Sequence, residues 1–353
     1  MRITVKTLVK TCKTIATFTI ASLIGLSVAA CGSQKPDTST KPTEDKNKPI
    51  SVVSTVDTWG TLAKEIGGTD VKVVSLLAGA DTDISDVKLN GKTSEALSSA
   101  QVIVTNGAGY DDWATKNLPK QAENVSAAST VGALKGDNPY LWMSKDARKA
   151  MANSLSEAFS RVKPNKRKEF EQRLNDWKDR EKKLEDYLDE FAKKHKDLKI
   201  ASTSPILFWL MSDLNLKDNA PKDYLSAISQ ETDPSSKSVS DFSKMLEDRK
   251  VDVLINDSQQ SKNDNINLIT GIAGRSYTSI INVSELMPSY AKQLDTWIIK
   301  ICDDIDNATK MSSSMREEID KQLKKPSKLV TEKPKPVVPG PARSNQGQTD
   351  PGK

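Results

Sequence analysis

Apolar residues follow two different periods along the chain, and the changes from one period to the other predict where strands and helices lie. Aliphatic and β-branched runs at 50–56, 71–77 and 101–105 have the composition of buried strands. Residues 58–68, and the segment just before the third run, have the period of helices. Strands and helices that alternate at this spacing predict a parallel sheet built from βαβ units.

A long amphipathic helix is predicted after Pro164. Its apolar residues recur at spacings of four and three, while charged residues fill the other faces. The stripe consists of Phe170, Leu174, Trp177, Leu184, Leu188 and Phe191. Glu181 occupies the one place where an apolar residue is expected. The pattern predicts a helix of about 30 residues, ~45 Å long. A coiled-coil dimer is the weaker alternative, because the repeat is short and one seam position is a glutamate.

The alternation of strands and helices resumes beyond this helix. Strands are predicted at 199–203, 251–256 and 277–283, and helices at 206–214, 233–250 and 263–275. A final helix is predicted over 289–311, and it places Cys302 in an apolar stretch where the thiol is expected to act as a small buried side chain. The sequence thus predicts an α/β fold with two parallel-sheet lobes joined by one long helix.

The chain divides into six predicted segments. These are a signal peptide at 1–30, a disordered tether at 31–49, a first lobe at 50–143, a helical segment at 144–198, a second lobe at 199–323 and a disordered tail at 324–353. Residues 32–49 contain no hydrophobic residue, and the tail holds six of the sixteen prolines. Neither segment can bury enough apolar surface to offset its ordering entropy. The tail either spans a wall, binds an anionic surface weakly, or has no partner.

The amino-terminal segment has the features of an export signal. Basic residues end at Lys13, an apolar stretch follows to Val28, and the sequence Val-Ala-Ala-Cys ends at Cys31. The stretch is shorter than the ~20 apolar residues that a membrane span needs. The tetrapeptide resembles a bacterial lipobox, which implies that Cys31 carries a lipid and anchors an extracytoplasmic protein to the cell membrane. An ordinary signal peptide cleaved after Ala30 is the alternative.

Charge and composition exclude several classes of function. Of the net charge of +5, residues 1–30 carry +4, residues 31–49 carry +1 and residues 324–353 carry +5, which leaves −5 for the body. An acidic body is not typical of a nucleic-acid-binding protein. The single histidine, His195, stands among lysines near the end of the long helix, where a capping or packing role is expected. No catalytic motif is present, so an enzyme is not predicted.

Four strings, spread in order over the body, resemble one family. They are SVVSTVDTWGTLAKEIGGTDVKVVSLL, AQVIVTNGAGYDDW, SQETDPSSKSVSDFSKMLEDRKVDVLINDSQ and INVSELMPSYAKQLDTWI. Together with the lipobox they resemble the metal-binding solute receptors of ABC transporters, the cluster A-I group that receives zinc or manganese. The resemblance implies a ligand cleft between the lobes, ABC permease and ATPase partners, and a monomer.

The resemblance also implies four ligand positions, which this family fills with three histidines and one carboxylate. In this chain the positions hold Ser85, Tyr140, Ser204 and Glu285, and a shift of two residues offers Asp83 as a substitute for the first. Glu285 is therefore the one expected metal ligand of the usual kind. Because neutral hydroxyls are poor ligands for Zn²⁺, direct binding of Zn²⁺ by the usual ligands is expected to be weak or absent, and the sequence leaves Zn²⁺ and Mn²⁺ open as cofactors.

Two other interpretations of the cleft remain open. The carboxylates of Asp81, Asp83 and Asp86 with Glu285 would suit Ca²⁺, Mg²⁺ or Mn²⁺, although a solvated acidic loop is the better explanation of them. Aromatic residues near these positions would suit an organic ligand. The leading hypothesis is a lipid-anchored solute receptor with a histidine-free cleft. The alternative is a degenerate member of the family that acts as a surface interaction protein or adhesin without binding metal.

Overall fold

The computed structural model describes residues 48–82, 90–116, 118–260 and 262–324. The predicted signal peptide, Cys31, almost all of the tether and almost all of the tail lie outside the described residues. Within them, no helix has both the length and the apolar character that crossing a membrane requires.

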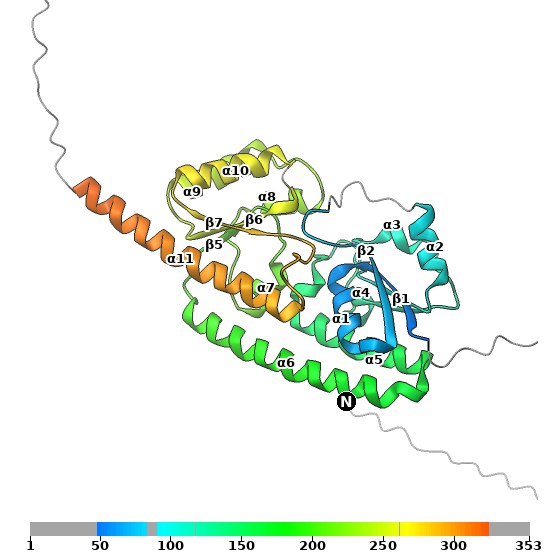
Figure 1. Cartoon of the computed structure of the whole chain (residues 1–353). Coiled ribbons are helices and arrows are strands. Elements are labelled where there is room, and N and C mark those ends of the chain that lie inside the picture. Colours follow the sequence, from blue (N-terminus) through cyan, green and yellow to red (C-terminus); the bar gives the residue numbers. More distant parts are fainter. Residues whose placement is uncertain (1–47, 83–89, 117, 261, 325–353) are drawn as a thin grey trace, which may run out of the picture. The chain divides into compact units, whose positions relative to one another are not determined.

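The first lobe contains a four-stranded sheet in which all strands are parallel (Figure 1). Its strands, in spatial order, are β2 (Val71–Leu77), β1 (Ile50–Val56), β3 (Val102–Thr105) and β4 (Glu123–Ser126). Its helices are α1 (Asp57–Gly67), α2 (Gly91–Ser99), α3 (Asp112–Thr115) and α4 (Ala127–Val131). Successive residues of a strand point to opposite faces. Val52 and Val104 therefore join the large central core, whereas Val53 and Ile103 pack in a smaller cluster with Leu97 of α2.

The second lobe repeats this construction on a three-stranded parallel sheet. The strands, in spatial order, are β5 (Ile200–Ser202), β6 (Val253–Asp257) and β7 (Ser279–Val283). The helices are α7 (Phe208–Asp213), α8 (Lys222–Ser229), α9 (Ser236–Glu247), α10 (Asp264–Arg275) and α11 (Leu294–Lys324). Val253 and Ile255 join the central core, while Leu254 between them packs with residues of α8, α9 and α10. Apolar side chains thus cover both faces of this sheet as well.

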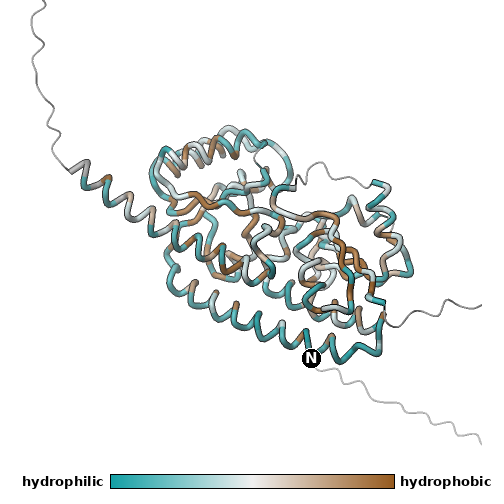
Figure 2. Tube along the Cα trace, in the orientation of Figure 1, coloured by the Kyte–Doolittle hydropathy of each residue, from teal (hydrophilic) through white to brown (hydrophobic). Residues whose placement is uncertain are grey.

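Two helices connect the lobes: α5 (Lys145–Val162) and the 28-residue α6 (Arg167–Lys194). Helix α6 contacts α1 and α5 of the first half of the chain and α11 of the second. The predicted stripe of apolar residues and Glu181 is its buried face. Figure 2 shows the hydrophobic residues gathered on the strands, while α6 is mostly hydrophilic along its length. The predicted α/β fold of two parallel-sheet lobes joined by a long helix is confirmed.

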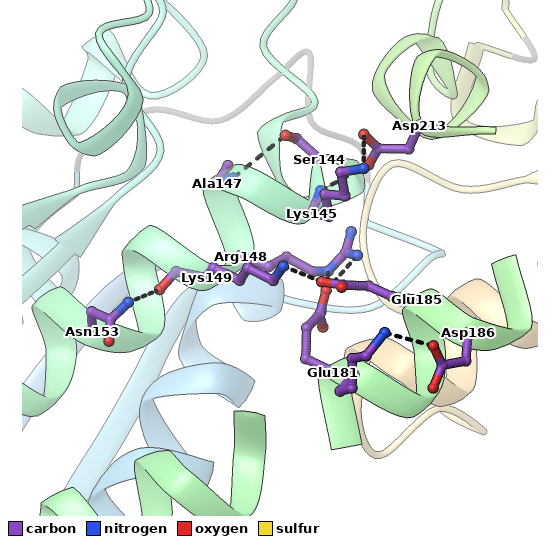
Figure 3. Close-up of polar contacts among 11 residues, drawn as sticks. Ser144, Lys145, Ala147, Arg148, Lys149, Asn153, Glu181, Glu185, Asp186 and Asp213 are labelled. Carbon is purple, nitrogen blue, oxygen red and sulfur yellow. Dashed lines mark hydrogen bonds and ion pairs between the residues drawn. The ribbon is translucent and has the colours of Figure 1, made fainter. Parts of the chain in front are cut away.

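Glu181 lies on the buried face of α6 because it has a partner there. Arg148 of α5 donates from Nη2 and Nε to Glu181 Oε1 at 2.7 and 3.0 Å (Figure 3). The arginine is fully buried and the glutamate is 3 % exposed. The remaining terminal nitrogen, Nη1, donates to the carbonyl of Trp142 at 3.2 Å. This two-residue pair therefore takes the place of an apolar contact between α5 and α6.

Several elements differ from the sequence prediction, among them the short helices α3 and α4, which are not predicted. Strand β4 is not predicted, because Val125 is the only buried residue of this short edge strand. Helix α8 is missed because only two of its residues are buried. Helix α11 begins at Leu294 rather than residue 289 and continues thirteen residues past the predicted end, through a polar segment in which an apolar period is absent.

Candidate functional site

Polar side chains from the two lobes meet where strands of both sheets end. Tyr110 follows β3 of the first lobe, and Glu285 follows β7 of the second. The Tyr110 hydroxyl donates to Glu285 Oε2 at 3.2 Å. Tyr140, also from the first lobe, hydrogen-bonds the same carboxyl group. In α/β folds, ligands bind beyond the carboxyl ends of parallel strands, so this contact marks the candidate site.

A second buried acid accompanies Glu285. Asp257, the last residue of β6, is fully buried and hydrogen-bonds the Glu285 carboxyl group. Burial and the charge of Asp257 raise the pKa of Glu285 to about 8, and burial also raises the pKa of Asp257. At neutral pH the pair therefore holds a proton between two carboxyl groups.

Ser204 joins the same network through Asp257. It lies two residues beyond the end of β5, and its hydroxyl donates to Asp257 Oδ2 at 2.8 Å. The neighbouring Thr203 Oγ1 accepts the backbone N–H of Asp257 at 3.0 Å. These two contacts fix the Asp257 side chain against the end of β5.

The loop that carries Tyr110 is held by a buried carboxylate. Asp111 accepts hydrogen bonds from the backbone N–H groups of Asn106 and Gly107, at 2.6 and 2.8 Å, and from the Thr55 hydroxyl at 2.6 Å. Gly107 has φ +76°, and a Cβ there would lie 2.6 Å from Ala128 Cβ. Only glycine fits this position, so the loop presents Tyr110 in one fixed place.

The backbone around Glu285 is held by contacts that also reach the first lobe. Gln259 Oε1 accepts the N–H groups of Glu285 and Leu286 at 2.7 and 3.0 Å, while its Nε2 donates to the Thr82 carbonyl at 2.7 Å. Asp57, which begins α1, accepts N–H groups from both Gly79 and Met287, which lie in different lobes. The site is therefore built on a hydrogen-bonded contact between the lobes.

An aromatic cluster supports the two phenols. The rings of Tyr110, Tyr140 and Trp142 contact one another edge to face, with centroids 5.2 to 6.3 Å apart. Such arrangements favour aromatic pairs beyond the area they bury. Burial and the nearby Glu285 raise the pKa of both tyrosines well above 10. Both side chains are therefore neutral hydrogen-bond donors toward Glu285 at neutral pH.

The structure brings together part of the predicted ligand set. Tyr140 and Glu285 touch directly, and Ser204 joins them through Asp257. The predicted positions Ser85 and Asp83 lie outside the described residues, as does Asp86.

The one histidine and the one cysteine among the described residues lie elsewhere. His195 directly follows α6, where its backbone N–H caps the helix, its ring stacks on Phe191 at 4.4 Å and its Nε2 lies 2.9 Å from Asp306 Oδ1. Cys302 is buried in the central core on α11. Neither side chain belongs to the site, and the histidine lies at the helix end with its ring packed on Phe191, as the expected capping or packing role requires.

Sequence reasoning did not identify Asp257 or Tyr110. The sequence could have identified Asp257 as a candidate site residue, because it is a carboxylate at the end of an apolar strand. The predicted strand stopped one residue before it. Tyr110 lies in a glycine-containing loop, and nothing in the local sequence shows that its hydroxyl crosses to the other lobe.

The described site offers oxygen atoms only. The groups that could coordinate a metal ion are two carboxyl groups, two phenols and a serine hydroxyl. Among the residues for which the structure gives positions, no three His, Cys, Asp or Glu side chains come together as a metal-binding group. The arrangement can hold a proton, or a cation that replaces it.

Comparison with solved structures defines the class of fold. The periplasmic zinc-binding protein TroA from Treponema pallidum is similar with a TM-score of 0.62 and 16% identity, over 74% of this chain and 99% of that one. The protein FpvC from Pseudomonas aeruginosa, solved with Mn²⁺, is similar with a TM-score of 0.60 and 16% identity, over 75% and 100%. ZnuA is similar with a TM-score of 0.58 and 16% identity, over 72% and 99%. This is the fold of two-lobed solute-binding proteins.

The family follows from the sequence itself. Residues 52–308 match the family described as zinc-uptake complex component A, periplasmic. The chain belongs to this family, which confirms the resemblance found in the sequence. The description of the family is that of an uptake component. No curated protein matches the chain.

Proposed function

We propose that this protein is the extracytoplasmic, lipid-anchored receptor of an ABC importer for metal cations, and that it delivers its cargo to a permease coupled to an ATPase. Membership of the zinc-uptake family supports the transport role. The lipobox ending at Cys31 supports the anchor, because the thiol follows an apolar stretch of signal-peptide length.

One observation carries the assignment of the site. Two phenols of the first lobe and two carboxyl groups of the second meet in a single buried network around Glu285. The two acids hydrogen-bond each other, and burial raises the pKa of both carboxyl groups, so the pair shares a proton at neutral pH. A cation that replaces this proton would contact both lobes, so its binding would hold them together.

Isothermal titration of the purified protein with Zn²⁺, Mn²⁺ and chelated Fe³⁺ tests this function. We expect saturable binding of at least one of these ions, and a loss of at least tenfold in affinity in Glu285→Gln. Glu95→Gln, at a helix of the first lobe away from the network, is the matched control. Absence of binding by all three ions would refute the metal-receptor function.

The anchor is tested separately. Cells grown with labelled palmitate should incorporate the label into the native protein and not into Cys31→Ser. Equal labelling of both proteins would overturn the proposed site of lipidation.

A second function is favoured by the donor set. Because the described residues contain no group of three His, Cys, Asp or Glu side chains, a surface interaction protein that no longer binds metal is the alternative. Such a protein would bind none of the three ions, and cross-linking on intact cells would recover a protein partner.

A further inference from the structure

The oxygen ligands of the site do not suit zinc, the metal in the family's description. Structural and catalytic zinc sites use imidazole nitrogen or thiolate sulfur, with carboxylates in a minority. The sequence has one histidine, and His195 lies at the junction of α6 and α11 beside Asp306. Cys302 is in the core. Among the residues that the structure describes, the cleft therefore has no imidazole or thiolate ligand of the kind that zinc prefers.

We propose that Tyr110 and Tyr140 are cargo ligands together with Asp257 and Glu285, and that this all-oxygen set selects a hard trivalent cation, represented by Fe³⁺, over Zn²⁺ and Mn²⁺. This inference rests on the proposed function and names its cargo class. Hard cations take oxygen ligands, and the ligand set determines selectivity more than raw affinity does.

The spacing of the oxygen atoms fits a single coordination shell. Two adjacent ligands of an octahedral ion with bonds of about 2.0–2.1 Å have oxygens roughly 2.9 Å apart. Tyr110 Oη lies 3.2 Å from Glu285 Oε2, and Tyr140 also lies within hydrogen-bond reach of this carboxyl group. Asp257 is hydrogen-bonded to Glu285 on the other side. The separation of Tyr110 Oη from Glu285 Oε2 therefore differs by only tenths of an ångström from that of two adjacent ligands.

Charge distinguishes a trivalent ion from a divalent one. The ionised carboxylates of Asp257 and Glu285 supply two negative charges, and one phenolate supplies a third. A bound cation favours the anionic form of the groups that coordinate it. When Fe³⁺ binds, any protons on the two carboxyl groups and the proton of one phenol would leave to solvent, and the buried shell would then be neutral. A divalent ion is balanced by the carboxylates alone and leaves both phenols as weak neutral donors.

The support behind the phenols suits this role. Asp111 fixes the loop that carries Tyr110, and the rings of Tyr110 and Tyr140 pack on Trp142, which is fully buried. Both hydroxyls are thereby held at the contact between the lobes. A shell whose ligands are fixed in advance loses less conformational entropy when the ion binds.

Visible spectroscopy tests the inference directly. A phenolate bound to Fe³⁺ gives a charge-transfer band in the visible, which Zn²⁺ and Mn²⁺ do not give. We expect the purified protein, titrated with ferric nitrilotriacetate, to develop this band to a stoichiometry of one, and resonance Raman excitation in the band to show phenolate modes. The band of the unmodified protein decides the question even if a variant fails to fold.

Variants identify the residues. Tyr110→Phe and Tyr140→Phe should each weaken the band and lower the affinity for Fe³⁺ at least tenfold. Tyr224→Phe is the matched control, because Tyr224 is fully buried in the core of the second lobe against Phe242. It should leave both quantities unchanged.

The possible outcomes separate this inference from the proposed function. Binding of Fe³⁺ without a visible band would overturn the inference. Tighter binding of Zn²⁺ or Mn²⁺ that both tyrosine variants retain would also overturn it, while the receptor function would stand. Failure of every ion to bind would refute both.

Discussion

Replacing Glu181 by leucine is expected to destabilise the fold by about 3–5 kcal/mol, because it leaves a buried guanidinium without a counter-charge. Arg148 is fully buried, and two of its nitrogens donate to the Glu181 carboxylate at distances of 2.7 to 3.3 Å (Figure 3). Among the described residues, the only other acceptor for its guanidinium is the Trp142 carbonyl. The variant thus removes most of the polar contacts of a group that cannot lose its charge.

The double variant Arg148→Met with Glu181→Leu distinguishes the loss of the whole ion pair from the loss of one partner, which leaves a buried charge unpaired. Buried ion pairs are often replaced by well-packed apolar residues at little cost, or with a gain of about 1–4 kcal/mol. We therefore expect the double variant to be at least as stable as the native protein, although Glu181→Leu alone is not. Urea unfolding followed by circular dichroism gives the free energies and completes the double-mutant cycle.

A matched control lies one turn further along the same helix. Lys182 and Asp186 form an exposed ion pair at 2.6 Å. Asp186→Leu should leave the urea midpoint where it is, because exposed pairs contribute little. The reasoning would be wrong if Glu181→Leu cost no more than Asp186→Leu, or if the double variant were as unstable as the single one.

Three further results are expected. Because the pKa of Glu285 is raised to about 8 from its ordinary value of 4.5, the folded state binds a proton that the unfolded chain releases, so the free energy of unfolding should fall as pH rises between these values. Glu285→Gln should flatten this dependence in urea titrations, and an unchanged slope would contradict the assignment. Gly107→Ala should cost more stability than Gly109→Ala, because both have positive φ but only the first Cβ would clash, at 2.6 Å from Ala128. Equal losses in thermal melts would refute the role of the close approach. Burial lowers the pKa of His195, so its imidazole, the only one in the chain, should titrate below pH 6.5 by NMR, and a midpoint above that value would be inconsistent with its packing.

The periodic elements of the fold could be predicted because their signal is local. The spacing of apolar residues in α6 is a direct consequence of which face the helix buries, and all six predicted stripe residues lie on that face. Strand β4 and helix α8 bury only one and two residues, respectively, so they leave almost no period to detect. Local patterns thus predict elements in proportion to how much of each is buried.

The site could be predicted only in part, because its contacts join distant segments. Glu285 was identified through the resemblance to a family, which fixes its position after the last strand. The partner that most changes its chemistry, Asp257, lies 28 residues earlier, and Tyr110 lies 175 residues earlier. Glu181 was recognised as an interruption of the stripe, but its explanation is Arg148, on a different helix. Pairings across such separations depend on the tertiary fold.

The long helix α6 also sets limits on motion. It packs on α1 and α5 of the first half of the chain and on α11 of the second, so it is a continuous helix in contact with both lobes. A wide swing of the lobes would have to bend this helix or strip one lobe from it. Entry and exit of a cargo are then expected to proceed by small displacements at the facing ends of the sheets, where single hydrogen bonds such as that of Gln259 to Thr82 are the contacts to be broken. Scattering profiles of the empty and loaded receptor should accordingly differ little.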